Sequence, residues 1–108
     1  MNASHPAWAR AARVKLMAFD VDGVLTDGSL YYSDAGIETK VFNTRDGHGL
    51  RMLQKAGIQL AIITGRRARC VELRMQNLGI DLVYQGVSEK QACLRRLLAE
   101  QGIAPEDA

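Results

Sequence analysis

The stretch VKLMAFDVDG, residues 14–23, decides the fold. Its first six residues, 14–19, are a compact apolar run that predicts a buried strand. Asp20 and Asp22 follow at once, and Gly23 lets the chain turn tightly. On an extended segment, residues two apart point to the same side, so we expect the two carboxylates to lie close together. Their repulsion needs a cation or a shared proton, and Mg²⁺ suits one or two carboxylates with water and phosphate.

Strands alternate with helices along the rest of the chain. This order predicts an α/β fold, a Rossmann-like parallel sheet flanked by helices, with a β-hairpin inserted after strand one. The predicted strands are residues 14–19, 59–63 and 81–84, the hairpin spans 29–32 and 37–42, and the helices are 6–12, 46–56, 67–78 and 88–101. We expect Asp46 to cap the second helix and Ser88 to cap the last one.

Composition limits the classes of function. The chain has 108 residues, 47% of them apolar, and a formal net charge of +2, as expected of a globular domain. A charge this small does not predict a nucleic-acid partner. No apolar run is long enough to span a bilayer, and the N-terminus lacks the apolar core of a secretory signal. With Cys70 and Cys93 expected to be reduced thiols, we predict a cytoplasmic location and no membrane partner.

A second polar motif, Thr64-Gly65-Arg66, follows the strand predicted at residues 59–63. In open parallel sheets, ligands bind beyond the carboxyl ends of the strands, so this motif and the Asp20 loop are expected to meet there. Lys90 falls in the first turn of a predicted helix, which is the unfavourable end for a cation. A bound anion would explain its position, and the plainer alternative is an exposed lysine at a small energetic cost.

Three motifs together carry a family resemblance. They are DVDGVLTDG at residues 20–28, Thr64-Gly65-Arg66, and Lys90 within Gly86-Val87-Ser88-Glu89-Lys90. The set resembles the haloacid-dehalogenase-like phosphatases of the hairpin-bearing subgroup that lacks a large cap domain. The stretch FNTRDGHG at residues 42–49 resembles more narrowly the 3-deoxy-D-manno-octulosonate 8-phosphate phosphatase family. The similarity runs from about Val14 to the C-terminus.

The resemblance implies a magnesium-dependent phosphatase that releases the free sugar acid in lipopolysaccharide sugar synthesis. Asp20 would be the nucleophile that becomes an aspartyl phosphate. Asp22 would act as general acid and base, and Thr64 and Lys90 would contact the phosphoryl group. Mg²⁺ would be held by the Asp20 carboxylate and the Asp22 backbone carbonyl. The implied substrate-binding residues are Asp22, Asn43, Thr44, Arg45, Asp46, Gly47, Arg51, Arg66, Arg74 and Lys90. Neither His5 nor His48 is expected to act in catalysis.

The family's fourth motif, an acidic loop that supplies another metal-ligating aspartate, does not occur in this sequence. We therefore expect residues 1–108 to be a single haloacid-dehalogenase-like phosphatase domain that is C-terminally truncated and poorly active alone. Strand one is then expected at an apolar, unpaired sheet edge. The resemblance also implies a homotetramer for the full-length protein, because the hairpin is too small to close the site as a lid.

Three alternatives remain open at this point. The first is a phosphatase of another sugar-acid phosphate, which the motifs do not separate from the first interpretation. The second is a non-catalytic oligomerisation module, against which the intact Asp20, Asp22, Thr64 and Lys90 weigh. The third, an arginine-rich nucleic-acid binder, depends only on the cluster from Arg66 to Arg74.

Overall fold

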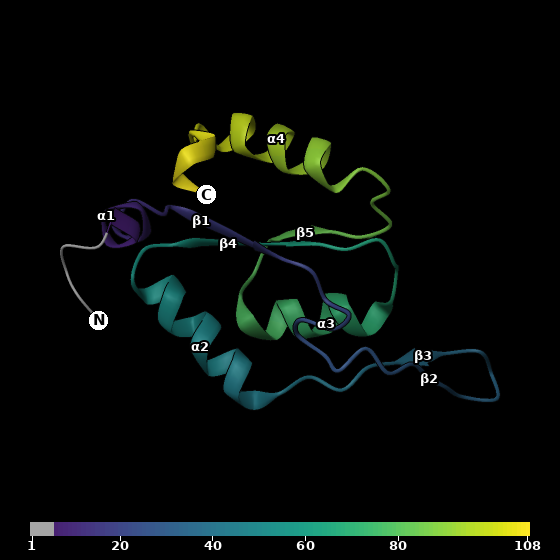
Figure 1. The fold of residues 1–108 in the computed structure, drawn as a ribbon. Helices are drawn as coiled ribbons and strands as arrows, with labels where there is room; N and C mark the ends of the chain where they lie inside the picture. Colours follow the sequence, from purple (N-terminus) through teal and green to yellow (C-terminus); the bar gives the residue numbers. More distant parts are fainter. Residues whose placement is uncertain (1–5) are drawn as a thin grey trace.

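The fold is a parallel sheet between two layers of helices, as the computed structural model of residues 6–108 shows (Figure 1). The sheet contains β1 (Leu16–Phe19), β4 (Gln59–Ile63) and β5 (Leu82–Tyr84) in the order β1-β4-β5. Both strand pairs are parallel. The helices are α1 (Pro6–Ala12), α2 (Thr44–Lys55), α3 (Arg69–Leu78) and α4 (Lys90–Gln101), and a short 3₁₀ helix, η1 (Pro105–Asp107), follows. The predicted α/β class is confirmed.

Side chains that alternate in direction along β4 contribute to two hydrophobic clusters, one on each face of the sheet. Leu60 and Ile62 pack into the larger cluster with the buried side chains of α2 and α3, and Ala61 packs into the smaller cluster beneath α4. Successive side chains of a strand point to opposite faces, so one apolar run serves both layers. The larger cluster also contains Leu50, Val71, Met75, Leu78 and Ile80, and the smaller one contains Leu16, Leu97 and Leu98.

Helix ends place the loops that carry the polar motifs. Gly79 ends α3 and Gly102 ends α4, each in the left-handed conformation that glycine adopts without steric cost, as the sequence predicted. The predicted cap of α2 is wrong, because its N-cap is Asn43, whose Oδ1 accepts a hydrogen bond from Arg45 N at 2.8 Å. Asp46 lies in the first turn of α2, where its negative charge interacts favourably with the helix dipole.

The predicted cap of α4 also shifts by one residue. The N-cap is Glu89 rather than Ser88, and it makes no side-chain capping hydrogen bond. Lys90 is therefore the first residue of α4 and remains in its first turn. An uncapped helix start with a cation at its first position leaves backbone N–H groups available to an anion.

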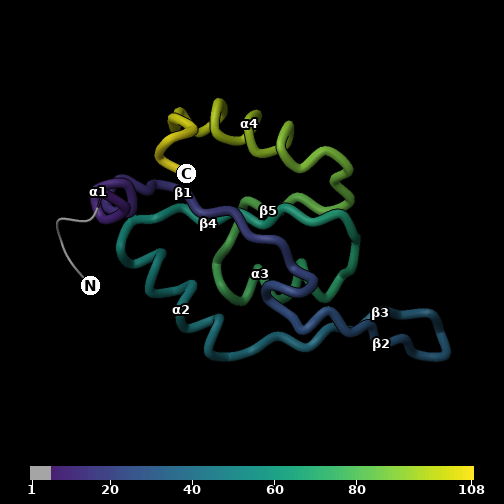
Figure 2. The backbone as a smooth tube through the Cα atoms, in the orientation of Figure 1, coloured from purple at the N-terminus to yellow at the C-terminus, as the bar shows by residue number. Residues whose placement is uncertain are grey.

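The insertion after β1 is a narrow hairpin that projects from the body of the protein (Figure 2). Its strands, β2 (Tyr31–Tyr32) and β3 (Glu38–Thr39), are shorter than predicted and pair through only two residues each. Ser33 N donates to Ile37 O, which closes the turn. Ile37 and Val41, which lie just outside β3 on either side, are 64% and 63% exposed.

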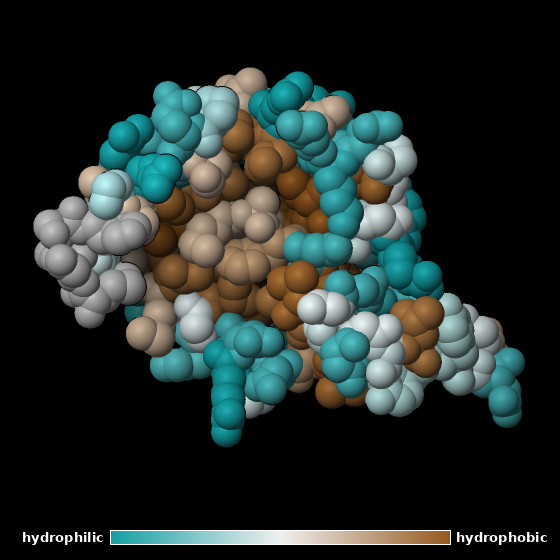
Figure 3. All heavy atoms as spheres, viewed as in Figure 1, coloured by the Kyte–Doolittle hydropathy of each residue, from teal (hydrophilic) through white to brown (hydrophobic). Residues whose placement is uncertain are grey.

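Within the described residues, β1 is an edge strand that pairs only with β4, as the sequence predicted. Figure 3 shows an apolar, hollowed surface over this part of the sheet, between α4 and α2. Ala18, Phe19, Ile63 and Leu94 line a depression there of about 310 Å³. None of the helices in residues 6–108 combines the length and apolar character that crossing a membrane requires.

Candidate active site

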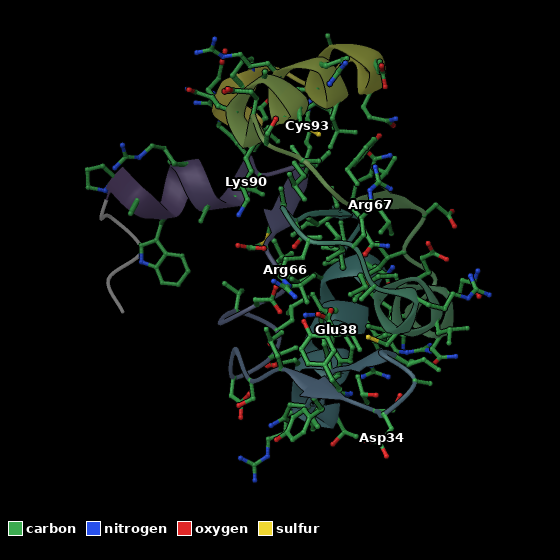
Figure 4. The ribbon with its side chains drawn as sticks, turned by 90° about the vertical axis from the view of Figure 1, so that its right-hand side faces the viewer. Asp34, Glu38, Arg66, Arg67, Lys90 and Cys93 are labelled. Carbon is green, nitrogen blue, oxygen red and sulfur yellow. The ribbon has the colours of Figure 1, made fainter. Side chains whose placement is uncertain are left out.

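The first group of polar side chains lies where β1, β4 and the start of α4 meet. Asp20 follows β1, Thr64 follows β4, and Lys90 opens α4. Lys90 Nζ donates a hydrogen bond to Asp20 Oδ2 at 2.7 Å, and the nearby Thr64 hydroxyl helps to lower the pKa of Asp20. Figure 4 shows Lys90 directed from α4 toward the loop that carries Arg66. The structure thus brings three of the four predicted catalytic side chains together at this edge of the sheet.

Hydrogen bonds to Asp20 favour its charged form. Partial burial acts to raise its pKa, but bonds from Lys90, from the Val21 backbone N–H and from Thr64 outweigh it and hold the pKa below its ordinary value. Thr64 is only 2% exposed, whereas the side chains of Asp20 and Lys90 are 33% and 49% exposed. A carboxylate that stays ionised and open to solvent is suited to act as a nucleophile.

Asp22 lies in a different environment from the one that the sequence predicted. The chain turns directly after Asp20, with three successive backbone N–H groups donating to Val21 O, so the two carboxylates do not share one extended face. Lys40 Nζ donates to Asp22 Oδ1 at 2.6 Å. Each carboxylate therefore has its own ammonium partner, Lys90 for Asp20 and Lys40 for Asp22.

Lys40 is the most deeply buried charge of this region. Its side chain is 1% exposed, and it also forms an ion pair with Glu38 Oε2 at 3.2 Å. Burial acts to lower the pKa of Lys40, but its bonds to Asp22 and Glu38 outweigh burial and raise that pKa. Because Asp22 and Glu38 both contact it, Lys40 joins the first loop to the hairpin.

Arg66 continues this chain of charges on the solvent side. Its guanidinium donates to Glu38 Oε1 and, at 3.0 Å, to the Tyr32 hydroxyl, and its Nε lies 4.0 Å from Asp22 Oδ2. Figure 4 shows Glu38 directed toward Arg66. The bond from Arg66 holds the pKa of Glu38 below its ordinary value, despite partial burial. Asp22 thus lies next to two cations that come from different elements.

The remaining predicted substrate residues fall into two neighbouring places. Asn43, Thr44 and Asp46 line an open depression of about 570 Å³ together with Thr26 and Asp27 from the loop after β1. This depression lies beside the Asp20 loop rather than over Asp20 itself. Arg45 is exposed at the start of α2.

Arg74 and Arg51 lie on the α3 side of α2. Arg74 packs against Gly47, so closely that a side chain at Gly47 would clash with the guanidinium. Arg51 donates to the backbone carbonyl of Asn77 at 2.8 Å. Arg51 therefore links α2 to α3. Of these two arginines, only Arg74 lines the small cavity that Asn43 and Asp46 also line.

Sequence analysis missed Lys40 and Glu38. The signal was present, because Ile37, Thr39 and Val41 alternate with Glu38 and Lys40 along the second hairpin strand. Alternation places Glu38 and Lys40 on one face, opposite the exposed Ile37 and Val41. A lysine and a glutamate on the inward face of a strand need ionic partners, and Asp22 was the available candidate.

Metal-ligating side chains are few in the part of the chain that the structure describes. No three His, Cys, Asp or Glu side chains of residues 6–108 come together as a metal site. The Asp22 side chain, the nearest carboxylate in sequence to Asp20, is engaged by Lys40. His48 is exposed on α2, and His5 lies outside the described residues.

Comparison with known proteins gives consistent matches. The chain is 48% identical over 99 residues to the 3-deoxy-D-manno-octulosonate 8-phosphate phosphatase KdsC of Escherichia coli strain K12, covering 92% of this chain and 53% of that relative. The phosphatase of this name from Moraxella catarrhalis, solved in complex with magnesium ion, phosphate ion and KDO, has a TM-score of 0.89 at 43% identity. That match covers 92% of this chain and 57% of the solved one.

A cobalt-bound deoxy-D-mannose-octulosonate 8-phosphate phosphatase from Haemophilus influenzae also matches, with a TM-score of 0.85 at 39% identity over 91% of this chain and 57% of that one. No protein-family model matches the chain. The chain spans about half the length of the curated relatives it matches.

The parallel sheet, the hairpin after its first strand and these likenesses define a haloacid-dehalogenase-like phosphatase fold. Within that fold, 92% of the chain is similar to phosphatases named for 3-deoxy-D-manno-octulosonate 8-phosphate, at 43–48% identity.

Proposed function

We propose that the protein hydrolyses 3-deoxy-D-manno-octulosonate 8-phosphate to the free sugar acid and inorganic phosphate. The observation that carries this proposal is the hydrogen bond from Lys90 to Asp20, beside Thr64, at the carboxyl ends of the paired strands β1 and β4. The 48% identity to a phosphatase with this substrate in its name supports the choice of substrate. The reaction would serve lipopolysaccharide sugar synthesis.

In the proposed first step, an Asp20 carboxylate oxygen attacks phosphorus and the bond from phosphorus to the sugar oxygen breaks. Asp22 gives a proton to the departing sugar oxygen, which leaves as an alcohol. Lys90, already bonded to Asp20, and the nearby Thr64 hydroxyl offset charge on the phosphoryl oxygens. In the second step, Asp22 takes a proton from water as the water attacks the aspartyl phosphate, which releases phosphate and restores Asp20.

Mg²⁺ is part of the proposal. The Asp20 carboxylate and the Asp22 backbone carbonyl are hard oxygen donors, and Mg²⁺ prefers such a small protein set completed by water and phosphate. When bound, the ion neutralises negative charge on the transferring phosphoryl group.

We further propose that Arg66, Arg74 and the start of α2 bind the sugar acid. Guanidinium groups pair with carboxylates through two parallel donors. Arg74 borders Asn43, Asp46 and Gly47, which supports this assignment. Arg51 and Arg45 are proposed to take part when substrate binds, since Arg51 is held by α3 in the present state.

The proposal extends to assembly and location. We propose that the full-length protein is a homotetramer built through the hairpin, because Tyr31, Tyr32 and Ile37 expose apolar surface there. We propose a cytoplasmic location, in which the free thiols of Cys70 and Cys93 stay reduced. A non-catalytic assembly module is not favoured, because all four motif side chains are present.

The test is a Mg²⁺-dependent assay of phosphate release by the full-length protein. We expect Asp20→Asn to abolish release and Asp81→Asn, an exposed aspartate far from the cluster, to leave it unchanged. A nine-carbon sugar-acid phosphate serves as the comparison substrate. Undiminished release by Asp20→Asn would contradict the mechanism, and preference for the nine-carbon substrate would contradict only the choice of substrate.

A further inference from the structure

Two of the groups assigned above, Asp22 and Arg66, are the ends of a network of four alternating charges. It begins at Arg66, passes through Glu38 and Lys40, and ends at Asp22. These residues come from the loop after β4, from the hairpin and from the loop after β1. The carboxylates and cations alternate and are equal in number, so the group carries no net charge.

The exposure of each of the four side chains determines which of them can contact a substrate. The side chain of Lys40 is 1% exposed and that of Glu38 is 11% exposed, whereas Asp22 is 24% and Arg66 46% exposed. A ligand can reach Asp22 and Arg66 from solvent. Lys40 lies behind Asp22, so any effect of Lys40 on chemistry must pass through the residues that it holds.

The geometry at Asp22 separates its two oxygens. Lys40 Nζ lies 2.6 Å from Oδ1, and Oδ2 is left with only the more distant Arg66 Nε, at 4.0 Å. A carboxyl group fixed through one oxygen can still carry a proton on the other one. The ion pair therefore fixes the torsion of the Asp22 side chain and leaves Oδ2 available for proton transfer.

Glu38 completes the arrangement by holding Lys40 and Arg66 at once. Its Oε2 faces Lys40 at 3.2 Å, and its Oε1 accepts from Arg66 and, at 3.1 Å, from the Tyr32 hydroxyl. Without Glu38, the ammonium of Lys40 would have one carboxylate rather than two to fix its position. The hairpin is thereby coupled to the orientation of Asp22.

We propose that Lys40, itself fixed by Glu38, is a positioning residue that orients Asp22 so that Oδ2 delivers the proton to the leaving oxygen. This inference rests on the proposed function, and it assigns the hairpin a role within a single subunit. General acid–base help is typically worth about 10²–10⁴-fold, and a displacement of the order of 1 Å can forfeit about 10²-fold. Loss of Lys40 therefore removes part, not all, of the contribution of Asp22.

The test compares two leaving groups in Lys40→Met, which keeps the side-chain length without the charge. An alkyl phosphate such as the sugar phosphate needs a proton on its leaving oxygen, whereas p-nitrophenolate leaves without one. We expect kcat for the sugar phosphate to fall roughly 10–100-fold and the burst rate of p-nitrophenolate to change less than about threefold. Lys55→Met, which removes an exposed lysine from α2, is the matched control and should change neither rate.

A double-mutant cycle with Asp22→Asn gives the second readout. If Lys40 acts through Asp22, Lys40→Met causes no further loss in the Asp22→Asn background. Equal losses for both leaving groups, or losses that multiply in the double variant, would overturn the proposal. Circular dichroism shows whether Lys40→Met folds. If it does not, Lys40→Met is combined with Glu38→Gln, which removes the Glu38 charge left without its lysine partner. The same results then support or overturn the proposal.

Failure of this inference is distinguishable from failure of the proposed function. If Asp20→Asn is inactive but Lys40→Met shows no difference between leaving groups, the phosphatase mechanism stands and the positioning role does not. If Asp20→Asn keeps full activity, the proposed function itself is wrong.

Discussion

Lys90 Nζ, in the first turn of α4, lies 2.7 Å from Asp20 Oδ2, at the end of β1 and 70 residues earlier in the chain. A lysine at a helix N-terminus faces an unfavourable dipole, so its contact with a carboxylate offsets a local cost. The pair therefore joins two elements at the point where the parallel strands present their carboxyl ends.

Lys90→Ala is expected to raise the pKa of Asp20, which now lies below the ordinary 3.8, and to impair phosphate release strongly. Because the folded-state pKa is lower than the unfolded one, ionised Asp20 stabilises the fold above about pH 4, and this contribution disappears as pH falls through the folded pKa. Carboxyl ¹³C shifts followed through an acid titration measure the change. An unchanged Asp20 pKa in Lys90→Ala would contradict the contact, and Lys55→Ala is the control.

The sequence places Lys90 and Asp20 in one site, whereas the contact of Lys40 with Asp22 was not recognised. The prediction of a strand at residues 59–63 has the bounds of β4, since an apolar-rich run lies between Gly57 and the polar Thr64. Topology alone then brings Thr64 and Asp20 together, because neighbouring parallel strands end at one edge.

Asp22 shows why the exact pairing with Lys40 was missed, although the alternation along the hairpin marks Lys40 as inward-facing. Its partner Lys40 is 18 residues away, across a loop whose turn at Val21 depends on backbone hydrogen bonds that no residue pattern reveals. The hairpin was predicted too long for a related reason. Alternation continues past Thr39 to Val41, but nothing packs on the outer face of these residues, so the strand pairing stops early.

Asn43→Ala is expected to destabilise the protein by about 0.5–2 kcal/mol, because the side chain that caps α2 is lost. Asn43→Asp keeps an acceptor for Arg45 N and should retain nearly all of the stability. Urea unfolding at pH 7 gives the free energies. Asp46→Ala removes only a dipole interaction worth about 0.3–1 kcal/mol, and a larger loss from Asp46→Ala than from Asn43→Ala would show that the cap is misassigned.

Gly47→Ala is expected to move Arg74 away from the start of α2, because the added methyl group would occupy the position of the guanidinium. If Arg74 binds the sugar acid, KM rises up to about tenfold, the equivalent of one charge-assisted hydrogen bond of about 1.5 kcal/mol. Gly49→Ala is the matched control on the same helix, since nothing lies within 4 Å of its added Cβ. Steady-state kinetics of both variants decide the point, and an unchanged KM in Gly47→Ala would remove Arg74 from substrate binding.

Ile37→Asp is expected to weaken the proposed tetramer without unfolding the subunit. Ile37 is 64% exposed at the hairpin turn, so the new charge meets solvent in the free subunit, whereas in a hairpin-mediated tetramer it would be buried without a partner. Such a change at the centre of an interface typically costs more than about 1–2 kcal/mol, or roughly tenfold in the dissociation constant. Sedimentation velocity over a range of protein concentrations measures the shift. Met52→Asp places the same charge at a 58% exposed position on α2, away from the hairpin, and should leave the tetramer intact. Identical sedimentation of Ile37→Asp and the unsubstituted protein would locate the interface elsewhere, because an aspartate cannot be buried at an apolar contact without cost.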